Sequence, residues 1–391
     1  MQFSDIPGLH DTKQHLIHAA DQGKVAHAQL FVGPAGSANL ALALAYATYL
    51  NCDDRQSDGS CGTSDSGAKM NKYIHPDFHF VFPVSATKNV TGKDVVSDSY
   101  LPSWRIFLRE HPYGDLAEWS IAFGGENKQL NISKEESRNI VRKLSLTAFE
   151  SRYKVVIIWM PELMHPAAAN GILKILEEPP EKTVFLLVAQ DTDRLLPTIL
   201  SRTQILTVRA FTTDEVMTYL QAHVPSAASD PERTQQAAAL SEGNIPYALR
   251  LYHEVQEDQP KLFQEWMRQC YAHDYTTLVT MTDEFQKLGK EGQKRLFYYG
   301  LTMMREVLVA LAVDTHASPG EETLVAQEKQ LIRAQGNALS FVANFSKVMN
   351  FSKVERLTKL FNEGYVHLER NVNPKMICLD TSLTIAQVLK S

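Results

Sequence analysis

The chain of 391 residues has few cysteines, no surplus of basic residues and no long apolar run. No stretch approaches the roughly 20 apolar residues that a membrane-spanning helix needs. The first residues, MQFSDI, lack the basic and apolar regions of a secretory signal. The formal net charge of -6 argues against a free-standing DNA-binding protein, because duplex affinity depends on Lys and Arg at phosphates. We therefore expect a cytoplasmic, globular protein.

The four cysteines do not by themselves complete a metal site. Cys270 and Cys378 are isolated in helical sequence and are expected to be buried, unreactive thiols. Cys52 and Cys61 flank a polar segment and could begin a zinc site with His75 as third ligand. Two Cys and one His leave the zinc tetrahedron open, so we expect no bound zinc. In a cytoplasmic protein we also expect no stable disulfide between Cys52 and Cys61.

The loop GPAGSAN begins at Gly33 and lies between an apolar run and an alanine- and leucine-rich helical stretch. Strand, glycine turn and helix in this order form the phosphate loop of many nucleotide-binding domains, with the pattern G-x-x-x-x-G-K-[ST]. Gly33 and Gly36 keep the turn, but the last three positions hold Ala38, Asn39 and Leu40. No lysine neutralises phosphate charge and no hydroxyl binds Mg²⁺ here. The sequence predicts a chain that does not hydrolyse ATP.

A second place for ATPase chemistry is also empty of catalytic groups. The run 154–158, KVVII, is typical of a buried strand in a parallel sheet, and an ATPase would end it with acidic residues that bind Mg²⁺. This chain has Trp159 and Met160 at those positions. Glu162 follows a proline, and we expect it to lie too far along to face the same site. The sequence therefore predicts two blank catalytic positions in one fold.

Later segments resemble a known family. The text NGILKILEEPP begins at Asn170, and LLPTILSRT begins at Leu195. Other matching stretches are GKVAHAQLF from Gly23 and NVNPKMI from Asn371. These segments and their order are similar to the clamp-loader ATPases of the AAA+ superfamily, known from bacterial DNA polymerase III. Within that family the chain resembles subunits whose own nucleotide site is blank.

The resemblance implies a fold of three parts. It implies an α/β AAA+ domain with a parallel sheet over 1–208, in which 85–127 is a variable insertion with short helices, including one over 101–110. A small helical lid domain over 209–255 and an all-helical collar, or oligomerisation domain, over 256–391 would follow. Apolar residues at three- and four-residue spacing independently predict helices in the last part. Periodicity alone also allows a helical bundle that packs only on its own chain.

The same resemblance supplies two further sites that are incomplete here. The family commonly has a four-thiolate zinc site, but two of its places hold Ser64 and Gly67, so Cys52 and Cys61 would be its remnant. Active relatives carry an arginine that touches the γ-phosphate from the last lid helix, and Pro246 stands in that place. We therefore expect no cofactor, because the ATP and zinc sites are both degenerate.

One charged residue of the family pattern is retained. Arg202, in the sequence Ser-Arg-Thr, matches the arginine finger that these subunits project into the ATP site of a neighbour. A guanidinium there stabilises charge on a γ-phosphoryl group supplied in trans. The alternative is a surface arginine in an ordinary ion pair. Lys174, Glu177 and Glu178 have the spacing of a salt bridge along one helix face, which indicates support of the fold.

The resemblance implies a non-catalytic structural, or stator, subunit of a clamp loader, which is not an enzyme by itself. Its partners would be the motor (γ/τ) and δ subunits of a hetero-oligomeric ring, and indirectly the sliding clamp and primer–template DNA. The alternative is an active AAA+ ATPase or a nucleotide-binding switch, for which Asn39, Trp159 and Met160 would have to be Lys, Asp and Glu. Binding without hydrolysis is a weaker alternative, because N–H groups at a helix N-terminus attract phosphate.

Overall fold

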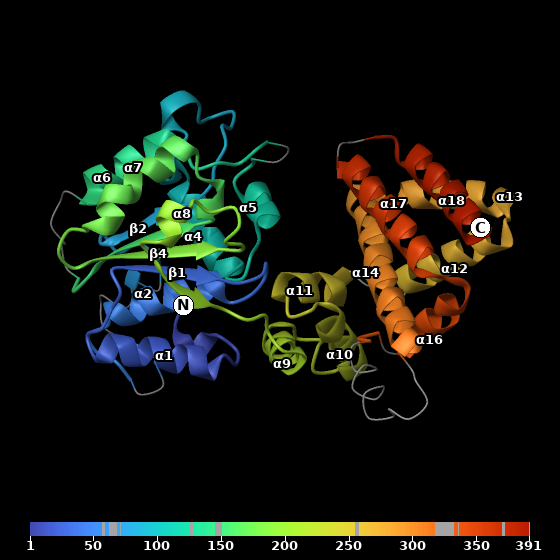
Figure 1. Ribbon diagram of the computed structural model, residues 1–391, viewed down its shortest axis with the longest axis horizontal. Coiled ribbons are helices and arrows are strands. Elements are labelled where there is room, and N and C mark those ends of the chain that lie inside the picture. Colours follow the sequence, from blue (N-terminus) through green and yellow to red (C-terminus); the bar gives the residue numbers. More distant parts are fainter. Residues whose placement is uncertain are drawn as a thin grey trace. The chain divides into compact units, whose positions relative to one another are not determined.

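The chain folds into two compact units, seen in a computed structural model (Figure 1). The structure describes residues 1–56, 59–61, 69–70, 72–125, 128–144, 151–254, 258–316, 332–334, 336–369 and 372–390. The first unit contains Met1–Asp230 and Ser241–Leu249, and the second contains Pro231–Leu240 and Arg250–Ser391. The predicted fold class, a parallel α/β domain followed by helices, is confirmed. The predicted three-part division at 208 and 255 stays a prediction, because the lid helices are shared between the two units.

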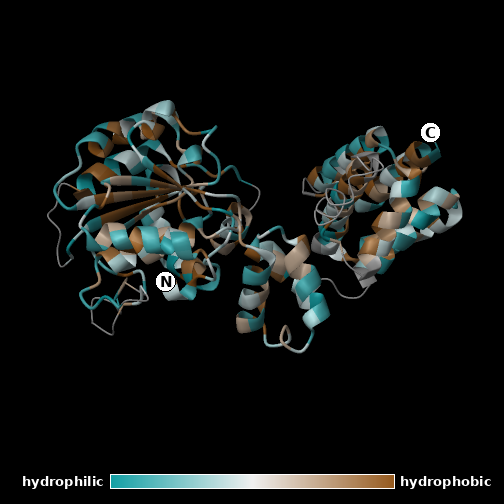
Figure 2. Ribbon diagram, turned by 60° about the horizontal axis from the view of Figure 1, so that its bottom comes forward, coloured by the Kyte–Doolittle hydropathy of each residue, from teal (hydrophilic) through white to brown (hydrophobic). Residues whose placement is uncertain are grey.

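The first unit is built on a sheet that has five parallel strands in the described part of the chain, in the order β2-β3-β4-β1-β5. The strands are β1 (Ala28–Val32), β2 (Phe78–Val81), β3 (Lys154–Trp159), β4 (Thr183–Ala189) and β5 (Gln204–Thr207). Every residue of β3 and β4 is buried, as apolar parallel strands covered on both faces should be, and Figure 2 shows them as hydrophobic. Val32 pairs with Ala189, and Trp159 pairs with Val188. The loops after β1, β3 and β4 therefore start side by side.

Helices cover the faces of this sheet (Figure 1). The described α-helices that lie wholly in the first unit are α1 (His10–Asp21), α2 (Asn39–Leu50), α4 (Leu101–Glu110), α5 (Leu116–Ala122), α6 (Lys134–Leu144), α7 (Pro166–Glu177), α8 (Pro197–Leu200) and α9 (Thr213–His223), which follows the last strand of the sheet. Every residue of α2 is buried. This explains its alanine- and leucine-rich sequence, because a helix that is apolar all round packs inside a domain.

The predicted insertion over 85–127 packs into the first unit, and α4 has the bounds that the sequence predicts. Its core is aromatic: the ring of Trp104 stacks on Phe82 at 4.2 Å between centroids and lies 5.1 Å from the ring of Trp159. Trp119 lies 4.9 Å from Trp104. The insertion is therefore joined to the sheet at the end of β3.

The second unit consists of helices in its described part. They are α10 (Pro231–Leu240), the part of α11 (Ile245–Glu254) from Arg250 on, α12 (Asp258–Ala272), α13 (Tyr275–Lys287), α14 (Gly289–His316), α16 (Gly336–Phe345), α17 (Phe351–Glu369) and α18 (Pro374–Lys390). Phe263, Trp266, Phe297 and Phe361 form its aromatic centre and are almost fully buried. The predicted helical bundle is confirmed.

Helix α14 corrects one expectation from the sequence. Among the described residues, its segment Gly292–Val313 is long and apolar enough to span a membrane by length and composition, with a mean hydropathy of 1.5. Within the protein, 56% of its apolar window is buried. A core helix meets the same criterion, so this is weak evidence for a membrane span.

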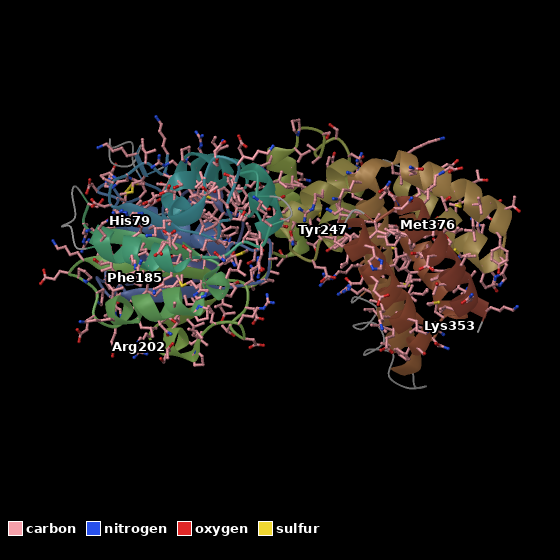
Figure 3. All side chains as sticks on the ribbon, turned by 90° about the horizontal axis from the view of Figure 1, so that it is seen from above. His79, Phe185, Arg202, Tyr247, Lys353 and Met376 are labelled. Atoms are coloured by element: carbon pink, nitrogen blue, oxygen red, sulfur yellow. A yellow bond between two sulfur atoms is a disulfide. The ribbon has the colours of Figure 1, made fainter. Side chains whose placement is uncertain are left out.

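His79 lies on the edge strand β2 of the first unit (Figure 3) and gives the fold a pH dependence. Burial, with the nearby charges of Lys143 and Lys154, outweighs Asp77 and Asp98 and lowers the pKa of His79 to about 4. The neutral ring is favoured in the folded state, so its stabilisation is complete above pH 6.5 and is lost as the pH falls toward 4.

We expect the free energy of unfolding to fall by about 3 kcal/mol between pH 7 and 4 because of His79 alone. In the His79→Gln variant, that part of the acid destabilisation should disappear. Urea unfolding at a series of pH values measures it, with His10→Gln as the control because His10 is exposed. An equal acid loss in wild type and His79→Gln would contradict the assignment.

Candidate functional site

The side chain of Asn39 occupies the predicted phosphate loop. Its Nδ2 donates to the carbonyls of Gly33 at 3.1 Å and Ala189 at 3.2 Å, and its Oδ1 accepts from the N–H of Leu40 at 2.8 Å. Asn39 is only 7% exposed. The N–H groups at a helix N-terminus are what binds phosphate in a working loop. Here the side-chain amide of Asn39 takes up the N–H of Leu40 at the helix N-terminus, together with the carbonyls of Gly33 and Ala189.

The two glycines of the loop allow close approach of other segments. A Cβ on Gly33 would lie 2.6 Å from the carbonyl oxygen of Val208 and 2.7 Å from Ser37 Oγ. The Ser37 hydroxyl is buried and has no hydrogen-bond partner in the described part of the chain. Gly36 has a φ of +74°, and a Cβ there would lie 2.2 Å from Oδ1 of Asn244. The loop is therefore closed in on both sides by protein.

The start of α11 closes over Gly36. The N–H of Ile245 donates to the carbonyl of Gly36 at 3.3 Å, and Oδ1 of Asn244 accepts from the N–H of Tyr247 at 2.9 Å. Asn244 thus caps the helix while it contacts the loop. Pro246 is in the first turn, where a missing N–H has no cost. Pro246 therefore belongs to a capped helix start that carries no arginine.

The end of β3 carries no carboxylate. Trp159 and Met160 are each 3% exposed, and Trp159 packs on Trp104 of the insertion. Met160 adopts a φ of 55° and donates its N–H to the carbonyl of Val188 at 2.8 Å. An indole and a thioether in these places cannot hold Mg²⁺, which prefers oxygen ligands.

Glu162 lies near this edge of the sheet. It belongs to the short helix η4 (Pro161–Leu163), and its Oε1 accepts from the N–H of Gln190 at 3.0 Å. Gln190 follows Ala189, whose carbonyl binds Asn39. The short helix η4 turns the chain back toward the end of β4. The expectation that Glu162 does not face the nucleotide site stays a prediction. Burial raises the pKa of the Glu162 carboxyl. Its Oε1 is bonded to backbone, whereas its Oε2 is buried and has no hydrogen-bond partner among the described residues.

Hydrogen bonds of Glu215 connect helix α9 to the first residues of the chain. Glu215 accepts two hydrogen bonds from Arg209 at 2.7 and 2.6 Å, and others from the N–H groups of Thr212 and Leu9. Burial opposes ionisation of Glu215, but these hydrogen bonds outweigh it and lower its pKa to about 2. The sequence indicated only the acidic first turn of α9 and not the contacts of Glu215 with Leu9 and Arg209.

Arg202 lies at the periphery of the first unit, after α8, while Phe185 lies in the sheet (Figure 3). Its Nε and one terminal nitrogen each lie 3.1 Å from Oε2 of Glu177, and its other terminal nitrogen donates to the carbonyl of Thr198 at 3.0 Å. The Arg202 side chain is 29% exposed and that of Glu177 is 59% exposed. The nitrogen that bonds Thr198 also donates to Oγ of Ser201 at 3.3 Å. Arg202 is therefore held by a carboxylate, a carbonyl and a hydroxyl at an accessible edge.

This ion pair corrects the salt bridge predicted along α7. The spacing of Lys174, Glu177 and Glu178 predicts a bond within the helix, whereas Glu177 pairs with Arg202 of another segment. Among the described residues no ion pair joins Lys174 to either acid. The packing of α8 beside the end of α7 brings the arginine closer, and a guanidinium fits a carboxylate better than an ammonium does.

The cysteines near α2 differ from expectation. Cys52 and Cys61 form a disulfide, with Cα atoms 5.9 Å apart, and the backbone of Cys61 pairs with that of Arg55 as an antiparallel bridge. The expectation of two separate thiols is wrong. No group of three His, Cys, Asp or Glu side chains in the described ranges could hold a metal, so His75 does not join this pair. The predicted zinc-site replacements Ser64 and Gly67 lie outside the described residues.

Cys270 and Cys378 are free and buried, as predicted. Burial raises the pKa of both thiols, that of Cys378 to about 12.

Comparison with known proteins identifies the family. The family described as DNA polymerase III, delta subunit, matches residues 8–212. The delta′ subunit of Yersinia pestis is 30% identical over 198 residues, which are 50% of this chain and 45% of the relative. The gamma/tau subunit of Mycobacterium tuberculosis H37Rv is 26% identical over 201 residues, 51% of this chain and 27% of the relative. The matched segments therefore span less than half of these relatives.

Among solved structures, a DNA polymerase III gamma subunit-related protein of Thermotoga maritima is similar to this chain at 16% identity. The match covers 86% of this chain and 99% of that chain, with a TM-score of 0.36. The family match includes the loop that begins at Gly33, the end of β3 and Arg202, and it extends over more than half of the chain. The chain therefore belongs to the DNA polymerase III, delta subunit family, and is a subunit of the delta′ type.

Proposed function

We propose that this chain is a non-catalytic structural subunit of the DNA polymerase III clamp loader. It helps to load the sliding clamp on primed DNA during replication, and it neither binds ATP tightly nor hydrolyses it. The observation that carries the proposal is the buried amide of Asn39, whose three hydrogen bonds use groups of the phosphate loop itself. A nucleotide would have to break these bonds and gain no lysine in return.

The second candidate is an active ATPase or a nucleotide-binding switch, as the gamma/tau relatives would suggest. Transfer of a phosphoryl group requires a cation and Mg²⁺ ligands at the reacting phosphates. In this chain Asn39, Leu40, Trp159 and Met160 supply neither. The contacts of Asn244 and Ile245 with Gly36 further favour a lid that rests directly on the loop. The structural role therefore fits these residues better.

We further propose that Arg202 acts in trans as an arginine finger for the ATP site of a neighbouring motor subunit. Three observations support this role: its position after α8, its partial exposure, and its orientation by Glu177. Because Glu177 is itself more than half exposed, its pair with Arg202 is only weakly stabilising and can be exchanged for a phosphate. In the free subunit, Glu177 would keep the Arg202 guanidinium ordered at the surface until the neighbour's phosphate replaces the carboxylate.

The proposed partners follow from this role. The motor (γ/τ) and δ subunits would form a hetero-oligomeric ring with this chain through its helical second unit. The sliding clamp and primer–template DNA would be reached through that ring, in the cytoplasm. We propose no ATP and no zinc as cofactors of this chain.

Co-expression tests the assembly directly. The tagged full-length chain, produced with the motor and δ subunits of its own organism, should elute with them as one complex in size-exclusion chromatography. The complex should hydrolyse ATP faster when clamp and primed DNA are added. A chain that elutes alone while the other subunits assemble without it would contradict the proposal.

A further inference from the structure

A disulfide joins two short described segments after helix α2, residues 52–56 and 59–61, and we call these two segments the disulfide hairpin. The bond joins Cys52 to Cys61, which are separated by 9 positions. The backbones of Arg55 and Cys61 pair as an antiparallel bridge, and the N–H of Gln56 donates to the carbonyl of Ser60 at 3.0 Å. The backbone therefore holds the two sulfur-bearing residues opposite each other.

This hairpin binds the N-terminal residues of the chain. The side-chain amide of Gln2 donates to the carbonyl of Cys61 at 3.3 Å and accepts from its N–H at 3.4 Å. A Cβ on Gly59 would lie 2.8 Å from Cδ1 of Ile17 and 3.1 Å from Cβ of Phe3, so the turn rests on both. Phe3 is fully buried. The hairpin therefore covers the short helix η1 (Phe3–Asp5).

The N-terminal residues that follow η1 reach helix α9 through Leu9. Ile6 and Leu9 are each 2% exposed, and the ammonium of Lys13 donates to the carbonyl of Ile6. The N–H of Leu9 donates to Oε1 of Glu215 in the first turn of α9. Residues 2–9 thus form a strap that connects the disulfide hairpin to the lid helix, and we call it the N-terminal strap.

We propose that Cys52 and Cys61 are a reversible redox-modification site and that their oxidation fixes the N-terminal strap against α9. Disulfides in cytosolic proteins are mostly transient or redox-sensing. The oxidant is a low-molecular-weight disulfide: the two protein thiols give up two hydrogens and join, while the small disulfide is reduced to two thiols. Cys61 is partly exposed and is the point of access, whereas Cys52 is 8% exposed.

Two features make the site selective. Cys270 and Cys378 are buried in the second unit, and their raised pKa values keep them as thiols, so they remain reduced. Asp53 and Asp54 follow Cys52 and are exposed, so they repel anionic reagents. An uncharged disulfide such as hydroxyethyl disulfide is therefore the suitable probe.

The experiment combines a thiol count with hydrogen exchange on the full-length protein. The protein is equilibrated with hydroxyethyl disulfide and mercaptoethanol at a series of ratios, quenched, denatured and alkylated, and its mass is measured. We expect four alkylated cysteines under reducing conditions and two under oxidising conditions. Oxidation should also slow amide exchange in the N-terminal strap by roughly 10- to 100-fold, because closing a short loop removes entropy from the open state.

The variant with Cys52→Ala and Cys61→Ala is the matched control. It should exchange at the rate of the reduced wild type at every ratio and carry two alkylated cysteines throughout. Four alkylated cysteines in the wild type at all ratios would overturn the redox site, and native mass spectrometry would then show whether zinc occupies the pair. A disulfide that forms without slowing exchange in the strap would overturn the link to α9. Neither outcome depends on the proposed role in clamp loading.

Discussion

Replacing Arg202 with alanine should slow ATP hydrolysis by the adjacent motor subunit in the reconstituted clamp loader, while folding and ring assembly stay intact. A finger acts across an interface, so its loss removes charge stabilisation from a site whose other parts belong to the neighbour. Such fingers contribute roughly 10³ to 10⁵ in rate at the site they serve. Because a ring has several active sites, the total rate should fall only in part. The measurement is clamp- and DNA-stimulated ATPase activity, with assembly checked by size.

Two further variants separate the finger from the ion pair. Arg202→Lys should not restore the full rate, because an ammonium lacks the planar fork that spans two phosphate oxygens. Glu177→Ala removes the partner of Arg202 in the free subunit and should leave most of the ATPase activity. Equal losses in Arg202→Ala and Glu177→Ala, or unchanged turnover in a correctly assembled Arg202→Ala ring, would reduce Arg202 to an ion-pair residue.

Replacing Trp104 with alanine should destabilise the first unit by about 3 to 5 kcal/mol, the range found for truncation of large buried aromatic residues. Trp104 is fully buried and contacts Phe82, Trp119 and Trp159, so its removal leaves a cavity at the end of β3. Urea unfolding followed by fluorescence and circular dichroism measures the loss. The account fails if the loss is below about 1 kcal/mol.

The control for this variant lies on the same helix. Ile106 of α4 is 46% exposed, and Ile106→Ala should change stability by no more than about 0.5 kcal/mol. A large effect of Trp104→Ala beside a small effect of Ile106→Ala would assign the insertion a structural role. It would show that aromatic packing at the end of β3 stabilises the first unit.

The strands and helices that position the site could be predicted from the sequence. The run that forms β3 is β-branched and uncharged after Lys154, which is typical of a strand buried on both faces. Residues 101–110 form a helix at the bounds predicted for the insertion. The residues Asn39, Trp159 and Met160 were identified from the sequence, because a lysine or acid is absent at these positions. That they leave the nucleotide site blank stays a prediction.

The contacts made by these residues could not be predicted. Asn39 binds Ala189, which is 150 positions away, and Arg202 binds Glu177, which is 25 positions away. Local spacing in the sequence carries no information on such distant pairs. The sequence therefore suggested a salt bridge of Lys174 within α7 instead. The disulfide was missed for another reason: the expectation rested on the compartment, whereas backbone pairing beside Arg55 decides that the two sulfur atoms meet.

The measurement that tests the central claim most directly is an equilibrium titration of the isolated chain with ATP and Mg²⁺, followed by a turnover assay. The account predicts no binding at low micromolar ATP and no hydrolysis above the background. Charge compensation is missing at Asn39, Leu40, Trp159 and Met160 together, and the loop is closed by its own hydrogen bonds. Binding at low micromolar ATP would contradict the claim of a blank site, and measurable turnover would contradict the non-catalytic role itself.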